Sequence, residues 1–456
     1  MPWASRDIVS TRLHGWQPLV LDLLPRALSV ARAGGHTVLC ADLLIHWGIL
    51  ANRSAVSGSA KTLWTEARDL YVSANHPSGI INATLRLADY VTPETAIQSC
   101  SDMCTLAKQS GDMLGLGKAL FVLGYSYGRK GDDPHAYAYY TDALQTLQAL
   151  PVPETYLSGR IRLFLAHMDY DDGRLASAVV QLEANISTLL ATGNKDALVR
   201  AYMLMGNIRL AQGLASQAVQ QFQQGISHAR TVREGPLEIM TLGSLISACL
   251  LVDDDTSALE AIRRTQELVN ADPDPQHQAY LLMGQGKLAL WSGDLEEAWA
   301  VLQAAIRSTR ATDVNTHAEG MLYTQAEVLA VLGQVALARQ GNYNVEARNI
   351  FTVLILAHRK AARQIKATYA LTWLARVVED NDVSEQILAA VMPRLLHCGL
   401  YPMLADAFLC SASIALRRKQ HGLARHRARS AASYIDEIDD HRGRVAAQDF
   451  LEVVCV

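Results

Sequence analysis

The chain has 456 residues, of which 50% are hydrophobic, 6% aromatic and 19% charged. This composition provides material for a large helical core and excludes an intrinsically disordered chain. The formal net charge of -4 excludes a surface built throughout to neutralise phosphate, so a nucleic-acid contact would have to be a local patch.

The N-terminal segment is polar, because residues 1–12 carry charged side chains where a signal peptide needs an apolar run. No stretch reaches 18 uninterrupted apolar residues, so no membrane-spanning segment is expected. The seven cysteines are odd in number, and most lie inside apolar helical patterns. Such cysteines are typical of small buried residues in a reducing compartment, so the sequence predicts a cytoplasmic protein.

The chain is predicted to consist of three parts. Residues 1–34 are expected to hold an entry helix, residues 35–441 a series of helical repeats, and residues 442–456 a capping helix. Caps are expected because a terminal repeat otherwise exposes its apolar face to water.

The clearest repeat begins near the middle of the chain. Gly206 is followed by Gly213 after seven residues, Ala218 after twelve and Phe222 after sixteen. We call the small residue at the start the anchor. It is expected to let a second helix approach closely, with Ala218 opposite it and Phe222 packing into the next hairpin. Gly213 is expected to end the first helix.

The same spacing recurs along the chain with a period of about 40 residues. Trp64 and Tyr140 take the position of Phe222 in two further full matches, and weaker copies fill the intervals. The anchors, in chain order, are Gly48, Ala88, Gly124, Ala166, Gly206, Ile246, Gly286, Gly333, Ala375 and Ala412.

These positions resemble the tetratricopeptide repeat family over nearly the whole chain. The resemblance implies an all-α, right-handed superhelical solenoid of about ten helix hairpins. Repeats of about 40 residues are similar to the sensor regions of bacterial signal-transduction ATPases and of maltose-regulator-type activators. Gly117-Lys118 does not complete a phosphate-binding loop, because Ala119 stands where that loop needs Ser or Thr.

The resemblance also implies which residues line the concave groove, since in this family the exposed positions lie six residues before and one after the anchor. The earlier position is occupied by Lys118, Arg160, Arg200 and Tyr280, and the later one by His167, Asn207, Lys287, Gln334 and Arg376. The first three would form a basic strip that favours an acidic peptide, a terminal carboxylate or a phosphate. The alternative is a set of solvated helix residues without a ligand.

Four aromatic residues are suited to line a pocket for a small ligand, with core packing as the alternative: Tyr280, Trp291, Tyr369 and Trp373. Cys100 and Cys104 have a spacing that can present two metal ligands on a helix, but both fall on core positions of their repeat. We therefore predict no metal and no cofactor.

The densest basic stretch runs from Arg417 to Lys419 and from Arg425 to Arg429. It is suited to dock a polyanion or an acidic partner, and the alternative is a solvated helix face.

The sequence thus favours a non-catalytic scaffold or sensor that binds a peptide or a partner protein in its concave groove. The alternative is a small-molecule-responsive regulator of transcription or signalling, which an enclosed pocket rather than an open groove would favour. An enzyme built on helical repeats is the third hypothesis, and no nucleophile elbow, paired-carboxylate site or His-x-x-x-His helix supports it.

Overall fold

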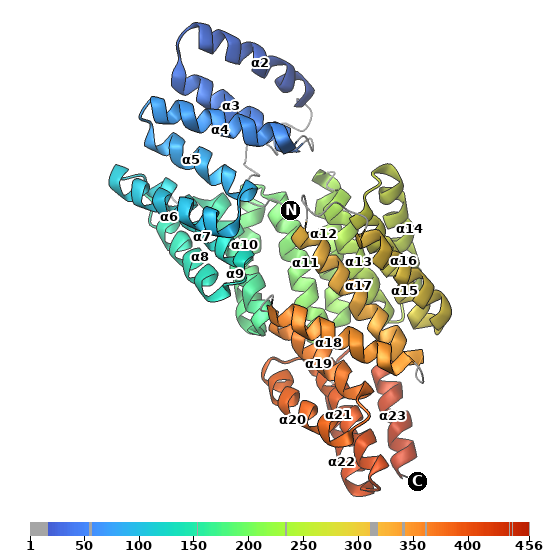
Figure 1. Cartoon of the computed structure of the whole chain (residues 1–456). Coiled ribbons are helices and arrows are strands. Elements are labelled where there is room, and N and C mark those ends of the chain that lie inside the picture. Colours follow the sequence, from blue (N-terminus) through green and yellow to red (C-terminus); the bar gives the residue numbers. More distant parts are fainter. Residues whose placement is uncertain are drawn as a thin grey trace. The chain divides into compact units, whose positions relative to one another are not determined.

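The computed structural model describes residues 17–53, 57–152, 154–232, 235–310, 318–339, 343–360, 363–436, 438–439 and 441–455. Within these ranges the chain forms α-helices and one short 3-10 helix, without any strand (Figure 1). The chain divides into two compact units, Met1–Met168 and Asp169–Val456, which are described separately. The sequence pattern did not predict this boundary, and the first sixteen residues of the expected entry segment lie outside the described ranges.

Unit 1 consists of hairpins that follow one leading helix. Its elements are α2 (Gln17–Ala33), α3 (Thr37–Arg53), α4 (Ser57–Ser73), α5 (Pro77–Leu87), the 3-10 helix η1 (Ala88–Tyr90), α6 (Pro93–Ser110), α7 (Met113–Lys130), α8 (Asp133–Gln148) and most of α9 (Thr155–Asp172). Trp64 and Tyr140, predicted as core positions of their repeats, are both buried.

Unit 2 continues the same alternation of first and second helices. Its elements are the end of α9, α10 (Leu175–Thr192), α11 (Lys195–Ala211), α12 (Ala215–Val232), α13 (Gly235–Leu251), α14 (Asp255–Ala271), α15 (Pro275–Ser292), α16 (Leu295–Arg310), α17 (Ala318–Arg339), α18 (Asn344–Lys360), α19 (Gln364–Val377), α20 (Asn381–His397), α21 (Tyr401–Arg417), α22 (His421–Ile435) and α23 (His441–Cys455). Each predicted anchor lies in the first helix of a hairpin, apart from Ala88 in η1, which follows α5 directly. The tetratricopeptide-like fold is therefore confirmed.

The anchor must be small because of the side chain sixteen residues later. A Cβ atom on Gly206 would lie 2.4 Å from the ring of Phe222, and one on Gly286 would lie 2.6 Å from Leu302. Such distances are far below ordinary van der Waals contact, so in these two repeats the second helix packs directly on the bare backbone of its own first helix.

The bulky residue also packs into the next hairpin, as predicted, because Phe222 shares a hydrophobic cluster with Leu242 and Leu245 of α13. At Gly206 the nearest atoms belong to Phe222 and not to Ala218, which corrects the expected place of Ala218 opposite this anchor.

The glycine seven residues after the anchor ends the first helix, as predicted. Gly213 has a φ of 84°, a left-handed conformation that favours glycine. Its N–H donates to the carbonyl of Leu210, and the N–H of Leu214 donates to that of Arg209. These bonds satisfy the last carbonyl groups of α11 and turn the chain into α12.

Unit 2 closes on itself through the loop between α22 and α23. The N–H of Asp439 donates to the carbonyl of Gly213 at 2.8 Å, and its carboxylate accepts from the N–H of Ser216 at 3.2 Å. A Cβ atom on Gly213 would lie 2.6 Å from Ile438. We call these four residues the clasp. The clasp joins the α11–α12 turn to the C-terminal hairpins, so the stack of unit 2 returns on itself.

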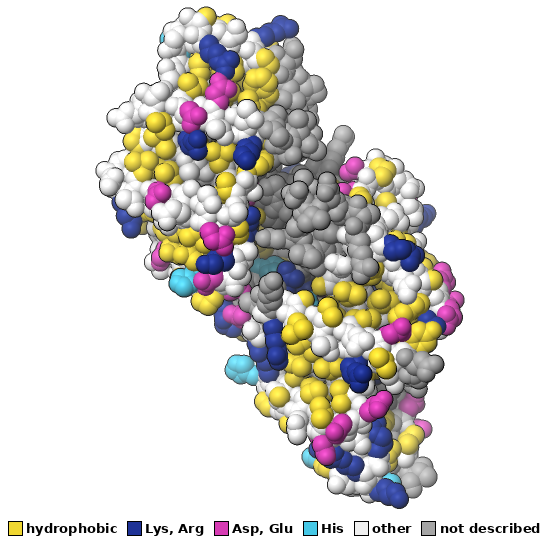
Figure 2. All heavy atoms as spheres, viewed as in Figure 1, with side chains coloured by type: hydrophobic (Ala, Val, Ile, Leu, Met, Phe, Trp, Pro, Cys, Tyr) yellow, Lys and Arg dark blue, Asp and Glu magenta, His cyan; other side chains and the backbone are white. Residues whose placement is uncertain are grey.

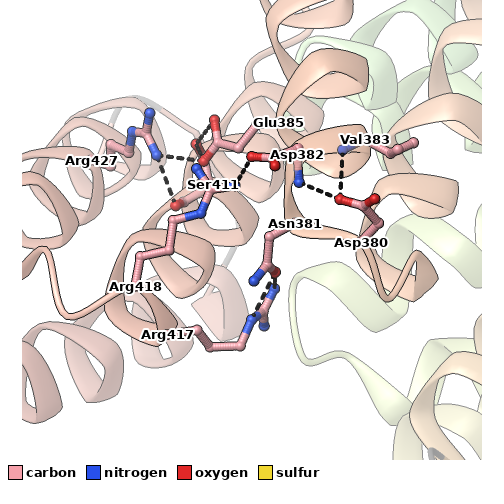
Figure 3. Close-up of polar contacts among 9 residues, drawn as sticks. All are labelled: Asp380, Asn381, Asp382, Val383, Glu385, Ser411, Arg417, Arg418 and Arg427. Carbon is pink, nitrogen blue, oxygen red and sulfur yellow. Dashed lines mark hydrogen bonds and ion pairs between the residues drawn. The ribbon is translucent and has the colours of Figure 1, made fainter.

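The basic stretch contributes to the packing of the last hairpins (Figure 3). Three of its arginines reach side chains at the beginning of α20. The pairs are Arg417 with Asn381, Arg418 with Asp382 and Arg427 with Glu385. These contacts tie α21 and α22 to the preceding helix, which supports a structural role for these three arginines.

Among the described residues, α10 is long and apolar enough to cross a membrane by length and composition alone. Its buried Ala178 and Leu182 lie twelve and sixteen residues after the anchor Ala166, and Glu183 is exposed. The pattern of α10 is therefore that of a second helix in a hairpin.

We expect Gly206→Leu to destabilise unit 2, because its side chain would occupy the space of Phe222. Overpacking of this kind lowers the free energy of unfolding by about 1–3 kcal/mol, or more where backbone must move. The measurement is urea denaturation, with Gly422→Leu as the control, since a Cβ atom on exposed Gly422 meets nothing within 4 Å. Unchanged stability of Gly206→Leu would contradict the packing of the anchor.

We expect Asp439→Ala to lower the free energy of unfolding by about 1 kcal/mol, because it removes the side-chain acceptor at the beginning of α12. Asp436→Ala is the control, since Asp436 is exposed on the preceding helix end. Thermal and urea denaturation of the two variants should differ. Equal stability of both variants and the wild type would show that the clasp does not stabilise unit 2.

Candidate functional site

Charged groups on the face shown in Figure 2 are mixed. The described Lys and Arg side chains are interspersed with Asp, Glu and apolar side chains there. This agrees with the small net charge of -4. The most distinctive group of ionisable side chains lies inside unit 2.

A cavity of about 230 Å³ lies within unit 2, lined mainly by first helices of consecutive hairpins. Its lining residues come from α9, α11, α13, α15, α17, α18 and α19. The polar and charged members are Tyr170, Asn207, Ser244, Ser247, Tyr280, Lys287, Glu327, His358, Lys366 and Tyr369. The others are Met203, Leu210, Met240, Gly243, Met283, Ala330, Leu354, Ala370 and Trp373.

The repeat places most of these residues on one stripe of each first helix. In α15 the stripe contains Tyr280, Met283 and Lys287, and in α17 it contains Glu327 and Ala330. Residues three and four apart share a helix face, so these positions point the same way. The stripe lies six and three residues before the anchor and one residue after it.

Lys287 of α15 lies at the cavity with a hydrogen-bond partner but without an ion pair. Its Nζ donates to Oγ of Ser247 in α13 at 2.8 Å. Among the described residues, no carboxylate lies within ion-pair distance of it. Burial lowers the pKa of Lys287, Glu327 acts to raise it, and Lys366 acts to lower it.

Glu327 and Lys366 form an ion pair between α17 and α19 at the same cavity. Burial by itself raises the pKa of Glu327. The ion pair with Lys366 outweighs burial, with a smaller effect of Lys287, and holds the pKa of that carboxyl below its usual value. Glu327 is therefore ionised at neutral pH.

His358 projects into the cavity from the second helix α18 and is only 4% exposed. Its Nδ1 is buried without a hydrogen-bond partner among the described atoms. Burial, with Lys366 and Arg363, lowers the pKa of His358 to about 4, although Glu327 and Asp171 act in the opposite direction. The imidazole is therefore neutral at pH 7.

The ionisable groups that line the cavity are unevenly paired. Lys366 is paired with Glu327, His358 is neutral at pH 7, and Lys287 is an amine without a carboxylate at ion-pair distance among the described residues. An anion in the cavity would favour the protonated form of Lys287 and be held by it.

Several residues that the sequence singled out lie at this cavity. Asn207, Tyr280 and Lys287 from the expected groove line it, as do Tyr369 and Trp373 from the expected aromatic pocket. Tyr280 also accepts a hydrogen bond at 3.4 Å from the hydroxyl of Thr324 in α17, which fixes its ring between two hairpins.

Other predicted residues lie elsewhere. Trp291 packs against the hydrophobic core formed by α12, α13 and α14 instead of lining the cavity. Arg376 is exposed, with a guanidinium nitrogen 3.8 Å from a carboxylate oxygen of Asp406. His167 is exposed near the end of unit 1.

The expected basic strip is divided between the two units. Lys118 and Arg160 belong to unit 1, where Arg160 lies over the ring of Phe121 at 5.7 Å. Arg200 belongs to unit 2. It was expected to be exposed, but only 6% of its surface is accessible to solvent. It lies 3.6 Å from Asp196 one turn earlier on α11. Close packing of that helix, which the spacing rule does not contain, buries it.

Sequence reasoning missed six polar or charged residues of the site, which are Tyr170, Ser244, Ser247, Glu327, His358 and Lys366. Glu327 lies six residues before the anchor Gly333, so the spacing rule contained the signal for it. Lys366 is outside that rule, and His358 is on a second helix. No pattern within a single repeat points to the last two.

The cysteines that were weighed as metal ligands are core residues. Cys100 and Cys104 are both buried, as their repeat positions predicted. Burial raises the pKa of the Cys100 thiol to about 12, so the sulfur is protonated at neutral pH.

Comparisons with solved structures give similar helical-repeat folds at low sequence identity. A Rap protein complexed with competence and sporulation factor is 11% identical, covers 87% of this chain and 98% of its own, and has a TM-score of 0.46. A Rap conjugation gene regulator of a plasmid, in complex with a Phr peptide, is 14% identical, with coverage of 79% and 97% and a TM-score of 0.43.

A signal-transduction ATPase with a tetratricopeptide repeat sensor, from Pyrococcus horikoshii, is 10% identical with a TM-score of 0.33. The match covers 86% of this chain and 55% of that protein, so this chain spans about half its length. No protein-family model matches the sequence, and no curated protein does either. These likenesses concern the fold alone.

We expect acid to destabilise unit 2 through His358. Its pKa lies below the ordinary 6.5, so between pH 6.5 and about 4 the unfolded chain binds more protons, and stability falls as pH falls. The difference corresponds to up to roughly 3 kcal/mol. The free energy of unfolding should therefore fall less between pH 7 and 4 in His358→Gln than in the wild type.

The control for this titration is His426→Gln, because His426 is exposed on α22. This variant should keep the pH dependence of the wild type. If His358→Gln kept it too, the imidazole would not be buried in its neutral form.

Proposed function

We propose that this tetratricopeptide-like protein is a non-catalytic sensor that binds a short peptide in the cavity of unit 2. The observation that supports this is the convergence of Lys287, Glu327 and Lys366, from three consecutive first helices, on one cavity. Stacked hairpins present side chains of successive repeats to the same ligand. We place this activity in the cytoplasm, where the free cysteines stay reduced.

The size of the cavity limits the ligand. Its volume of about 230 Å³ lies below the roughly 300–1,000 Å³ of pockets that enclose drug-sized molecules. A space of this size accommodates a side chain or a terminal residue of a peptide. It does not accommodate the surface of a folded partner protein, which would have to contact the chain elsewhere.

Binding in this cavity is suited to change the state of the stack. A ligand that touches α15 and α19 at once bridges hairpins that are two repeats apart. It then favours the closed arrangement that the clasp also stabilises, since a ligand shifts an equilibrium toward the state it binds better. A partner protein that binds the closed and the open form of unit 2 with different affinities would then respond to whether the cavity holds a ligand.

A small-molecule effector is the second candidate. It is favoured by the enclosure of the cavity by seven helices and by its apolar lining, which includes Met203, Met240, Met283 and Trp373. The basic residues of unit 1, Lys118 and Arg160, stay candidates for a separate contact with an acidic partner.

The test uses two defined mixtures, random hexapeptides and small organic metabolites, with retained molecules identified by mass spectrometry. We expect wild-type protein to retain members that Ala330→Trp does not, because a Trp side chain at residue 330 fills the cavity. Ala300→Trp is the matched control, since Ala300 is exposed on the second helix α16. The affinity of a retained peptide should fall at least about tenfold in Ala330→Trp alone. Equal retention by all three proteins would refute the cavity as the binding site.

A further inference from the structure

We infer that the ligand of this cavity is a monoanion, a single carboxylate attached to an apolar body, and that Lys287 binds the carboxylate. The inference rests on the proposed function, because it names the ligand class for the same cavity. Three features of the cavity carry it: its amine without an ion pair, its unused hydrogen-bonding groups and its apolar wall.

The amine without an ion pair fits one negative charge. Glu327 already pairs with Lys366, so Lys287 is the amine at the cavity that has no anionic partner among the described residues, and an incoming anion favours its protonated form. A carboxylate beside protonated Lys287 brings the cavity to neutrality, whereas a phosphate dianion would leave an excess negative charge beside Glu327. Arginine, the usual side chain for bidentate phosphate recognition, is absent from the residues that line the cavity.

The unused hydrogen-bonding groups match the oxygens of a carboxylate. The ammonium of Lys287 has three donors, and among the described residues it has one acceptor, the hydroxyl of Ser247. His358 is a second polar residue of the same lining, and its imidazole is only 4% exposed, with Nδ1 buried and without a hydrogen-bond partner among the described atoms. A buried polar atom without a partner costs free energy, which a polar group of the ligand would recover.

The rest of the wall is apolar and adaptable. Met203, Met240 and Met283 lie on three consecutive first helices, and Trp373 lies on α19. Methionine side chains adapt to irregular apolar shapes, and a Trp ring offers a large flat contact. A carboxylate with an apolar body occurs at the C-terminus of a peptide ending in an apolar residue and in small apolar carboxylic acids.

The experiment compares matched acids and amides. One pair is a random hexapeptide pool ending in leucine, with a free carboxylate or with a terminal amide. The other pair is a pool of small apolar carboxylic acids and the primary amides of the same acids. Each pool is equilibrated with the full chain as wild type, Lys287→Gln, Lys195→Gln or Ala330→Trp, and retained molecules are quantified by mass spectrometry.

The variants separate the cavity cation from charge in general. Lys287→Gln keeps a hydrogen-bond donor and removes the charge, whereas Lys195→Gln removes an exposed charge at the beginning of α11, outside the cavity lining. Thermal unfolding checks that all variants are folded. A hydrogen bond to a charged group is worth about 1.5–3 kcal/mol, so we expect Lys287→Gln to weaken acid binding roughly 10- to 100-fold. Lys195→Gln should bind as the wild type does.

Each outcome supports or overturns the inference about the carboxylate, the proposed peptide-binding function, or both. Retention of acids over amides, lost in Lys287→Gln and Ala330→Trp, supports the inference, and the pool that is retained identifies the source of the carboxylate. Equal retention of acids and amides, lost only in Ala330→Trp, overturns the inference and leaves the proposed function intact. An equal loss in Lys195→Gln and Lys287→Gln also overturns it, since binding would then follow overall charge. Retention that Ala330→Trp does not change overturns both.

Discussion

The structure depends on the contact between the small anchor of each first helix and the side chain sixteen residues later. At Gly206 and Gly286 the second helix lies so close that a single methyl group would collide with Phe222 or Leu302. Such a contact fixes the rotation of each first helix about its own axis, because only the face without a side chain can meet the partner. The opposite stripe of that helix must then face the inner side of the stack, and there the side chains of successive repeats come together.

The clasp is a second contact that holds unit 2 together, in addition to the packing of neighbouring hairpins. Asp439 and Ile438 close the stack onto the α11–α12 turn, more than two hundred residues earlier in the chain. The turn after α9 also meets these hairpins, since a Cβ atom on Gly173 would lie 2.5 Å from Sγ of Cys398. A stack closed by such contacts suits a protein that responds to a ligand.

The charged groups inside the cavity are costly to bury. Glu327 and Lys366 offset one another, but Lys287 is an amine whose pKa burial lowers, and His358 is held neutral with an unpartnered nitrogen. A core built only for stability would place apolar residues at such positions. Buried ionisable groups with shifted pKa values cluster at functional sites in proteins, and this is the reason for proposing the cavity and not the exposed basic residues as the site.

The sequence by itself determined the hairpins, the anchors, the glycine that ends a first helix and the stripe that contains Asn207, Tyr280 and Lys287. All of these follow from spacing within one repeat, where 3.6 residues per turn and the size of the anchor leave little freedom. Only the tertiary structure decided that Arg200 is buried, that His358 and Lys366 join the site, and that the chain divides near residue 168. These features depend on the small rotations between neighbouring hairpins, which add up along the stack and which no single repeat encodes.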